Sequence, residues 1–261
     1  TTYTVVITET STGCIDNDAM DVLFNSVPTP AFTVDKTCIN QITEFTDAST
    51  IASGSVTGWA WDFDDLGVTS VAQNPTHQFS GAGTYQVKLV VTSNLGCKDS
   101  ITVAVTIDPK PTADFTFANL CLTNSTQFTN ASTIASGTIT SLSWDFDGLG
   151  SSFAPNPSFV FPAAGTYDVK LVSGSGAGCL DSITKQVVIV ANPTANAGPD
   201  RDICPGASVQ IGVAPSAGFT YSWTPTTGLS NANIANPIAT PTSPTTYTVV
   251  ITETSTGCID N

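Results

Sequence analysis

The strongest constraint on this chain is an exact internal repeat. Residues 1–17 (TTYTVVITETSTGCIDN) recur without a change as residues 245–261, so the sequence repeats with a period of 244 residues. Repetition of this kind indicates an array of similar units rather than one large globular domain, because each unit builds its own local structure. We therefore interpret the chain as slightly more than one period of a longer repeating sequence.

A shorter period lies within the long one. The segment ASTIASG at 48–54 returns at 131–137, and the segment that begins with Trp61 returns at Trp144. The offsets are 82 or 83 residues, and a more divergent third copy follows. The chain is therefore expected to contain three types of module. We predict the boundaries 1–27 for the last strands of a preceding third-type module, 28–109 and 110–191 for two complete modules, and 192–261 for a third module that is truncated before its last strand.

Each module has the pattern of a small β-sandwich. Short segments in which apolar and polar residues alternate are separated by turns rich in Gly, Asn and Pro. The alternation places Trp59, Trp61 and Phe63 on one face of a strand. Because several short strands recur with turns every 8–12 residues and no segment has a helical period, the predicted fold is all-β, with immunoglobulin-like sandwich modules arranged end to end.

The strand that follows the G-T-Y sequence of each complete module shows the same alternation. One face of the first copy carries Tyr85, Val87, Leu89 and Val91. Tyrosines start this strand in all three modules, at Tyr85, Tyr167 and Tyr247. They have two readings, a tyrosine corner that bonds back to upstream backbone, or a half-buried strand residue.

The charge balance excludes several classes of function. The chain has 21 Asp and Glu against 7 Lys and Arg, a formal charge of −14, and no basic stripe. Nucleic acid and anionic membrane surfaces both need such a stripe, so we expect neither as a partner. No apolar run approaches the roughly 18 residues of a membrane span. Low charge and abundant polar residues instead favour an extracellular protein.

Catalytic motifs are missing from the sequence. It contains no G-x-S-x-G, H-E-x-x-H or P-loop pattern, and its one histidine, His77, has no cysteine or carboxylate close to it in sequence. We therefore predict that the chain is not an enzyme and holds no cofactor.

Clustered carboxylates are the one candidate for metal binding. They lie at the end of a strand in the first two modules, at Asp62, Asp64, Asp65, Asp145 and Asp147. Carboxylates in such a cluster can hold Ca²⁺, although the spacing is not that of an EF-hand. The favoured alternative is that these residues face solvent and form turns.

Seven cysteines pose the sharpest structural question. Each module has one before its second strand and one at the turn before its last strand: Cys38 and Cys97, Cys121 and Cys179, Cys204 and Cys258, with Cys14 as the second cysteine of the preceding copy. A metal site is not indicated, because there is no C-x-x-C pair. Regular pairs in a polar chain without helices favour disulfides and an oxidising compartment.

Two pairing schemes remain open. The first joins the two cysteines of each module. In a seven-stranded sandwich, however, these two turns lie at opposite poles, about 20 Å apart for a six-residue strand, whereas a disulfide needs Cα atoms within about 7 Å. We therefore favour bridges between neighbouring modules, Cys38–Cys179 and Cys121–Cys258, with Cys14, Cys97 and Cys204 pairing outside this chain. The within-module scheme holds if a strand is missing or the first strand is bent.

Several motifs resemble a known family, the PKD (polycystic kidney disease) domain. They are the W-D-F-D-(D/G)-x-G runs at 61–67 and 144–150, Asn-Pro at 74–75 and 156–157, and the G-T-Y-x-V-K-L strands. Asp64 and Asp147 replace a glycine of the family pattern, and SWTPTTGLS replaces the hallmark in the third module. The resemblance covers nearly the whole chain and implies a non-catalytic extracellular spacer or adhesion module.

The tandem arrangement also resembles the repeat regions of giant surface adhesins of gliding Gram-negative bacteria, which a type IX system exports. In such bacteria Asp-Ser-apolar sequences are O-glycosylated, and this resemblance implies Ser100 and Ser182 as candidate acceptors. The alternative is that these Asp-Ser pairs cap a hairpin turn.

Three classes of function follow. We favour a structural segment of a long cell-surface fibre or adhesin stalk. The expected partners are neighbouring copies of the repeat, and surface glycans or other cells are further candidates. A glycan- or protein-binding module is the second reading, with Trp59 as the one candidate platform unless it packs in the core. An accessory region of a secreted protease or glycosidase is the third.

Overall fold

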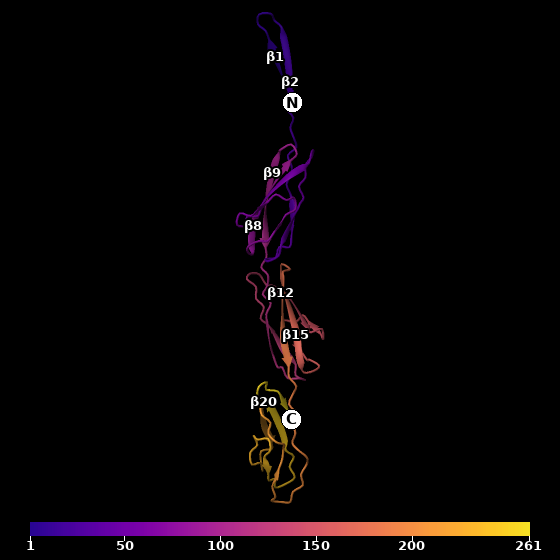
Figure 1. The fold of residues 1–261 in the computed structure, drawn as a ribbon, viewed down its shortest axis with the longest axis vertical. Helices are drawn as coiled ribbons and strands as arrows, with labels where there is room; N and C mark the ends of the chain where they lie inside the picture. Colours follow the sequence, from indigo (N-terminus) through magenta and orange to yellow (C-terminus); the bar gives the residue numbers. More distant parts are fainter. The chain divides into compact units, whose positions relative to one another are not determined.

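The computed structural model describes all of residues 1–261 and consists of strands and turns without a helix. The prediction of an all-β chain is thus confirmed, and no long apolar helix suited to crossing a membrane is present. The chain divides into two compact units, Thr1–Lys110 and Pro111–Asn261 (Figure 1).

The first unit begins with a two-stranded antiparallel hairpin. It is formed by β1 (Thr2–Thr8) and β2 (Ile15–Asp21), which pair from Thr2 opposite Asp21 to Thr8 opposite Ile15. All side chains of both strands are exposed, including those of Val5 and Ile7. The hairpin is drawn in indigo in Figure 1.

A two-sheet sandwich makes up the rest of the first unit. One sheet has the order β3-β4-β7 and contains β3 (Phe32–Asp35), β4 (Thr43–Asp47) and β7 (Thr76–His77). The other has the order β6-β5-β8-β9 and contains β5 (Val56–Asp62), β6 (Thr69–Ser70), β8 (Gly83–Ser93) and β9 (Lys98–Ile107). All pairings within the two sheets are antiparallel, as in immunoglobulin-like sandwiches.

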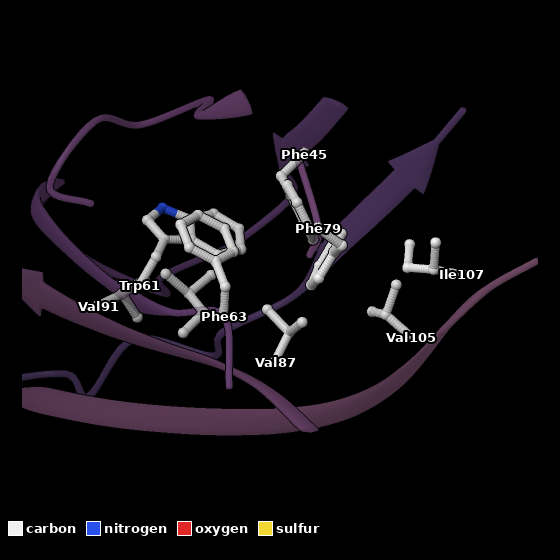
Figure 2. Packing of buried hydrophobic residues seen from close by; sticks show 9 residues of the cluster. Phe45, Trp61, Phe63, Phe79, Val87, Val91, Val105 and Ile107 are labelled. Atoms are coloured by element: carbon white, nitrogen blue, oxygen red, sulfur yellow. The ribbon is translucent and has the colours of Figure 1, made fainter. Parts of the chain in front are cut away.

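The core of this sandwich is an aromatic cluster between the two sheets (Figure 2). Trp61 is fully buried, with Phe32 packed edge-on at 5.1 Å and Phe45 at 5.6 Å between ring centroids. The predicted faces are confirmed: Trp61 and Phe63 are buried, as are Val87, Leu89 and Val91 on β8. Full burial of side chains of this size contributes about 1.5–3 kcal/mol each, which makes the cluster the main source of stability.

The second unit contains two further sandwiches. The first of them repeats the sheet orders of the preceding unit, as β10-β11-β14 and β13-β12-β15-β16. Its strands are β10 (Phe115–Ala118), β11 (Thr126–Asn130), β12 (Ile139–Phe146), β13 (Ser151–Ser152), β14 (Ser158–Phe159), β15 (Gly165–Ser175) and β16 (Leu180–Ile189). Its core is again aromatic and is centred on the fully buried Trp144.

The third sandwich is smaller. It has the sheets β17-β19 and β18-β20-β21, formed by β17 (Val209–Gln210), β18 (Phe219–Thr224), β19 (Ile238–Ala239), β20 (Thr248–Glu253) and β21 (Ile259–Asp260). Only Trp223, Val249 and Ile251 form its buried core cluster. In the description below, the sandwiches around Trp61, Trp144 and Trp223 are the first, second and third modules.

The tyrosine at the start of each long strand is half-buried and also bonds to backbone. Tyr85 donates its hydroxyl to the carbonyl of Gly81 at 2.9 Å, and Tyr167 donates to that of Ala163 at 2.8 Å. Both acceptors lie four residues upstream, which is the geometry of a tyrosine corner. Tyr247 differs, because its hydroxyl donates to the carbonyl of Thr227, twenty residues upstream.

Candidate functional site

The candidate site is a disulfide between two modules. Cys121, in the connection between the first two strands of the second module, is bonded to Cys258, in the turn before the last strand of the third. Their Cα atoms lie 5.4 Å apart, within the usual range for a disulfide, and 137 residues separate them in sequence. The bond therefore joins one pole of the second module to one pole of the third.

Backbone hydrogen bonds hold the Cys121 segment in place. The N–H of Leu122 donates to the carbonyl of Val190 at 2.8 Å, and the N–H of Val190 donates to that of Leu120 at 2.8 Å. This short parallel bridge fixes the cysteine beside the end of β16. The first module has the same bridge, between Cys38 and Asp108.

The Cys258 side of the disulfide is a tight hairpin turn. The carbonyl of Cys258 accepts the N–H of Glu253 at 2.8 Å, and the N–H of Cys258 donates to Oγ1 of Thr256 at 3.2 Å. Gly257, with φ of 75°, occupies the left-handed conformation that favours glycine. Hydrogen bonds within the turn thus hold the cysteine in place.

The other cysteines occupy the positions that are equivalent to Cys121 or Cys258 in the remaining modules. With Cys121 bonded to Cys258, neither the pair Cys121–Cys179 nor the pair Cys204–Cys258 of the within-module scheme is formed. Cys38 belongs to the first unit and Cys179 to the second, and their pairing stays a prediction. The thiols of Cys14, Cys97 and Cys204 are free, and those of Cys14 and Cys204 are exposed.

The clustered carboxylates act as turn formers. Asp62 accepts the N–H of Asp64 at 3.0 Å, Asp64 accepts that of Gln86 at 2.9 Å, and Asp145 accepts that of Gly148 at 2.9 Å. Asp64 and Asp147 have positive φ, at 56° and 57°.

These carboxylates form no ligand set for a metal. No group of three or more His, Cys, Asp or Glu side chains gathers anywhere in positions that would hold an ion. The calcium site at Asp62, Asp64, Asp65, Asp145 and Asp147 stays a prediction to which the structure gives no ligand cluster.

Sequence reasoning missed a polar cluster around the buried Asp65, which the half-buried His77 and the exposed Ser80 complete. Oδ2 of Asp65 lies 2.8 Å from Nε2 of His77 and accepts the N–H of Ser80 at 3.0 Å, while Oδ1 accepts the Ser80 hydroxyl at 2.5 Å. The His77 ring stacks on Phe63 with 4.5 Å between centroids. Asp65 is thus a carboxylate in the core wall with three donors around it.

Comparison of the first two module sequences could have revealed this cluster. The equivalent residues of the second module are Gly148, Phe159 and Pro162, so all three polar residues change together. Phe159 stacks on Phe146 with 4.4 Å between centroids, as His77 does on Phe63. The second module therefore fills the same space without a buried charge.

The cluster is built for structure rather than catalysis. The hydrogen bond from the Ser80 hydroxyl, followed by that from His77, lowers the pKa of Asp65 below its usual value. The Ser80 hydroxyl donates to Asp65 and not to the His77 ring, so the three residues do not form the Ser-His-Asp arrangement of a hydrolase.

The remaining candidates lie on the surface or in the core wall. Ser100 and Ser182 are exposed on β9 and β16, opposite Val90 and Val172, so both lie within strands rather than in the hairpin turns. Their modification stays a prediction. Trp59 is half-buried, packs against the core of the first module and donates its indole N–H to Oδ2 of Asp47 at 2.7 Å. It therefore presents no free aromatic platform.

Replacing Asp65 by Asn tests the polar cluster. The amide brings a donor to a place where three donors already point, so we expect the first module to lose about 1–3 kcal/mol at pH 7. Because the folded pKa of Asp65 is lowered, its contribution is present above the unfolded value of about 3.9 and is lost as pH falls below it. The difference between wild type and Asp65→Asn should therefore shrink below about pH 4.

Urea unfolding followed by the NMR signal of the single histidine reports on the first module alone, because His77 is the only histidine. Asp64→Asn is the matched control: it removes a neighbouring charge that takes no part in the Asp65 cluster, and Asn tolerates the positive φ. A pH-independent difference for Asp65→Asn, or an equal effect of Asp64→Asn, would contradict the assignment.

Comparison with known proteins places the fold in a family. Residues 25–107 and 108–191 each match the PKD domain. The pre-pro-metalloprotease PrtV of Vibrio cholerae is 26% identical over 146 residues, which are 54% of this chain and 15% of PrtV. The collagenase ColA of Bacillus cereus is 34% identical over 80 residues, 30% of this chain and 8% of ColA. The chain thus spans a small part of the length of these relatives.

Solved PKD domains are similar to single modules. The PKD1 domain of Vibrio anguillarum Epp is 25% identical, with a TM-score of 0.30, over 32% of this chain and 96% of that domain. The PKD1 domain of the Vibrio cholerae metalloprotease PrtV is 27% identical, with a TM-score of 0.29, over 31% of this chain and 98% of that domain. Since the two matched ranges together make up more than half of the chain, this protein belongs to the PKD domain family.

Proposed function

We propose that this chain is a structural repeat segment of a long extracellular fibre or adhesin stalk at the cell surface, in which disulfides between modules provide stiffness and tensile strength. The observation that carries the proposal is the Cys121–Cys258 disulfide between modules in a chain with an exact 244-residue repeat. The resemblance to the giant adhesins of gliding bacteria with type IX secretion supports the same role.

The mechanical effect follows from where the bond lies. An unfolded chain lengthens by about 3.3–3.6 Å per residue under tension. A disulfide whose cysteines are 137 residues apart passes the force directly from one module pole to the next and keeps the intervening chain out of the load. It also restricts bending at the linker, which is otherwise a mobile point between domains.

The repeat extends this scheme to the remaining cysteines. Residues in matching positions of the repeat meet in the same way, so Cys38 pairs with Cys179, and Cys204 pairs with the Cys97 of the following period. Cys14 is the copy of Cys258 and pairs with a Cys121 of the preceding period. Every module is then bonded to both neighbours, and neighbouring copies of the repeat are its main partners.

An accessory repeat region of a secreted hydrolase is the second candidate. The PKD-containing relatives named above are a metalloprotease and a collagenase, and a catalytic domain outside this chain fits that role. A glycan-binding module is less favoured, because Trp59 packs against the core. Glycosylation at Ser100 and Ser182 is compatible with either role, since both side chains are exposed.

Non-reducing peptide mapping of the oxidised chain tests the pairing. We expect linked peptides that contain Cys38 with Cys179 and Cys121 with Cys258, because each pair joins matching module poles. Recovery of a peptide that links Cys38 to Cys97 would overturn the scheme. That result would favour the hydrolase-accessory role, which does not require disulfides between modules.

Single-molecule stretching tests the mechanical role. In a Cys38→Ser/Cys179→Ser background, reduction should lengthen the fully extended chain by roughly 450–490 Å, because the 137 residues between Cys121 and Cys258 enter the load path. Adding Cys258→Ser to that background is the control and should give the full length without reductant. Equal lengths before and after reduction in the background variant would contradict the proposal.

A two-period chain tests the bond to the next copy. It is made by adding a second copy of residues 18–261 directly after Asn261, which continues the repeat. If the first Cys204 pairs with the second Cys97, then Cys204→Ser in the first period frees that Cys97 and raises the count of free thiols, measured after denaturation, by one. If Cys204 is unpaired, the same substitution lowers the count by one.

A further inference from the structure

The first and last strands of a complete module are the two strands that tension pulls on. The chain enters the second module at β10 and leaves it after β16. A backbone bridge between Cys121 and Val190 joins the connection after β10 to the residue after β16, and Cys38 and Asp108 form the equivalent bridge in the first module. Both modules therefore share one backbone tie between the end of the last strand and the segment that follows the first.

Side chains of β16 add a second set of ties in the second module. Nζ of Lys185 donates to the carbonyl of Phe115 at 2.6 Å and pairs with Oδ1 of Asp114 at 2.7 Å. It also lies 5.1 Å from the centroid of the Phe115 ring, a cation–π distance. Four residues before Lys185, Asp181 accepts the N–H of Ala113 at 2.8 Å. Two side chains of the last strand thus hold three consecutive residues where the first strand begins.

Strand register identifies the position of Lys185 in the first module. Lys185 lies opposite Val169, and Val103 lies opposite Val87, in sheets of the same strand order. A valine therefore stands where the second module has its ammonium group. Because the valine side chain has no hydrogen-bond donor, this tie cannot form in the first module.

The partners on the first strand differ as well. Thr29 and Thr112 form equivalent isolated bridges. The residues after them therefore correspond, and they are Pro30 and Ala31 in the first module and Ala113 and Asp114 in the second. Proline has no N–H to donate to a carboxylate, and alanine has no carboxylate to pair with a cation. All of these side-chain ties are thus missing from the first module together.

We propose that Lys185 and Asp181 form a clamp that makes the second module open at a higher force than the first, so that the two modules of a stretched chain open in a fixed order. The force at which a module opens follows its unfolding rate, and ties between the two pulled strands must break before the strands separate. Of these ties the first module has the backbone bridge alone. The inference rests on the proposed stalk function and adds to it one more compliant and one more resistant module in each period.

Single-molecule stretching of the full chain in reductant measures the order of opening. Gly-Ser insertions of 20 residues after Ala52 and 40 residues after Ala135 mark the first and second modules, because they lengthen the two opening steps by about 66–72 Å and about 132–144 Å. Both sites lie in exposed loops, which tolerate insertions. We expect the first-module step at the lower force, and a first-module step at an equal or higher force would overturn the proposal.

Lys185→Met tests the clamp itself. Methionine keeps an unbranched apolar stem but has no ammonium group, so the second-module step should move to lower force while the first-module step stays unchanged. Lys170→Met is the matched control: Lys170 follows the buried Val169 on β15 and therefore points to the other face of the sheet. An unchanged second-module force in Lys185→Met, or an equal fall in Lys170→Met, would contradict the clamp.

Transfer of the clamp covers the case in which Lys185→Met weakens the fold as a whole. Pro30→Ala, Ala31→Asp and Val103→Lys together give the first module the residues of the second and should raise the force of the first-module step. An unchanged force in the folded triple variant would sink the proposal. The disulfides are reduced in these measurements, whereas peptide mapping tests the disulfide pairing, so the clamp and the proposed stalk function can each fail while the other stands.

Discussion

In each module one buried tryptophan joins the two sheets, and its indole N–H must find an acceptor inside the protein. Trp61, Trp144 and Trp223 donate to the carbonyls of Ala72, Ala154 and Ile234 at 2.9–3.0 Å. An unpaired buried donor would cost about 1–3 kcal/mol, so the loop after the tryptophan strand must fold back over the core. This loop therefore covers the core at the middle of each module, and the cysteines lie away from it, in the connections at the poles.

Much of this core could be predicted from alternation alone, because a strand side chain has only two faces to choose from. Trp61, Phe63 and the apolar residues of β8 follow that rule. The contact of Asp65 with His77 and Ser80 could not be predicted in this way. Its members lie 12 and 15 residues apart and meet only after the sheets pack. The acceptor of Tyr247 was unpredictable for a related reason, since Thr227 belongs to a loop of the third module that differs from those of the other two.

The disulfide between modules illustrates a different kind of inference. Strand length and the distance limit of a disulfide already argued against pairing across a whole sandwich. The sequence pattern did not predict the local bridge between Cys121 and Val190. This bridge lies just after β16, where the chain leaves the second module. This bridge brings the cysteine to the start of the linker, so the turn that carries Cys258 is within reach although 137 residues intervene.

The identical segments 1–17 and 245–261 separate the effect of local sequence from that of tertiary packing. In both copies the N–H of the turn glutamate, Glu9 or Glu253, donates to the carbonyl of the turn cysteine at 2.8 Å, and Thr8 and Ile15 pair in the same register as Thr252 and Ile259. Yet Val249 and Ile251 are buried, whereas Val5 and Ile7 are exposed. The same turn and register therefore form with and without a covering sheet, and the neighbouring sheet supplies the burial. Because a two-stranded hairpin is marginally stable by itself in water, the stability of this segment in a repeating chain depends on the sandwich that covers it.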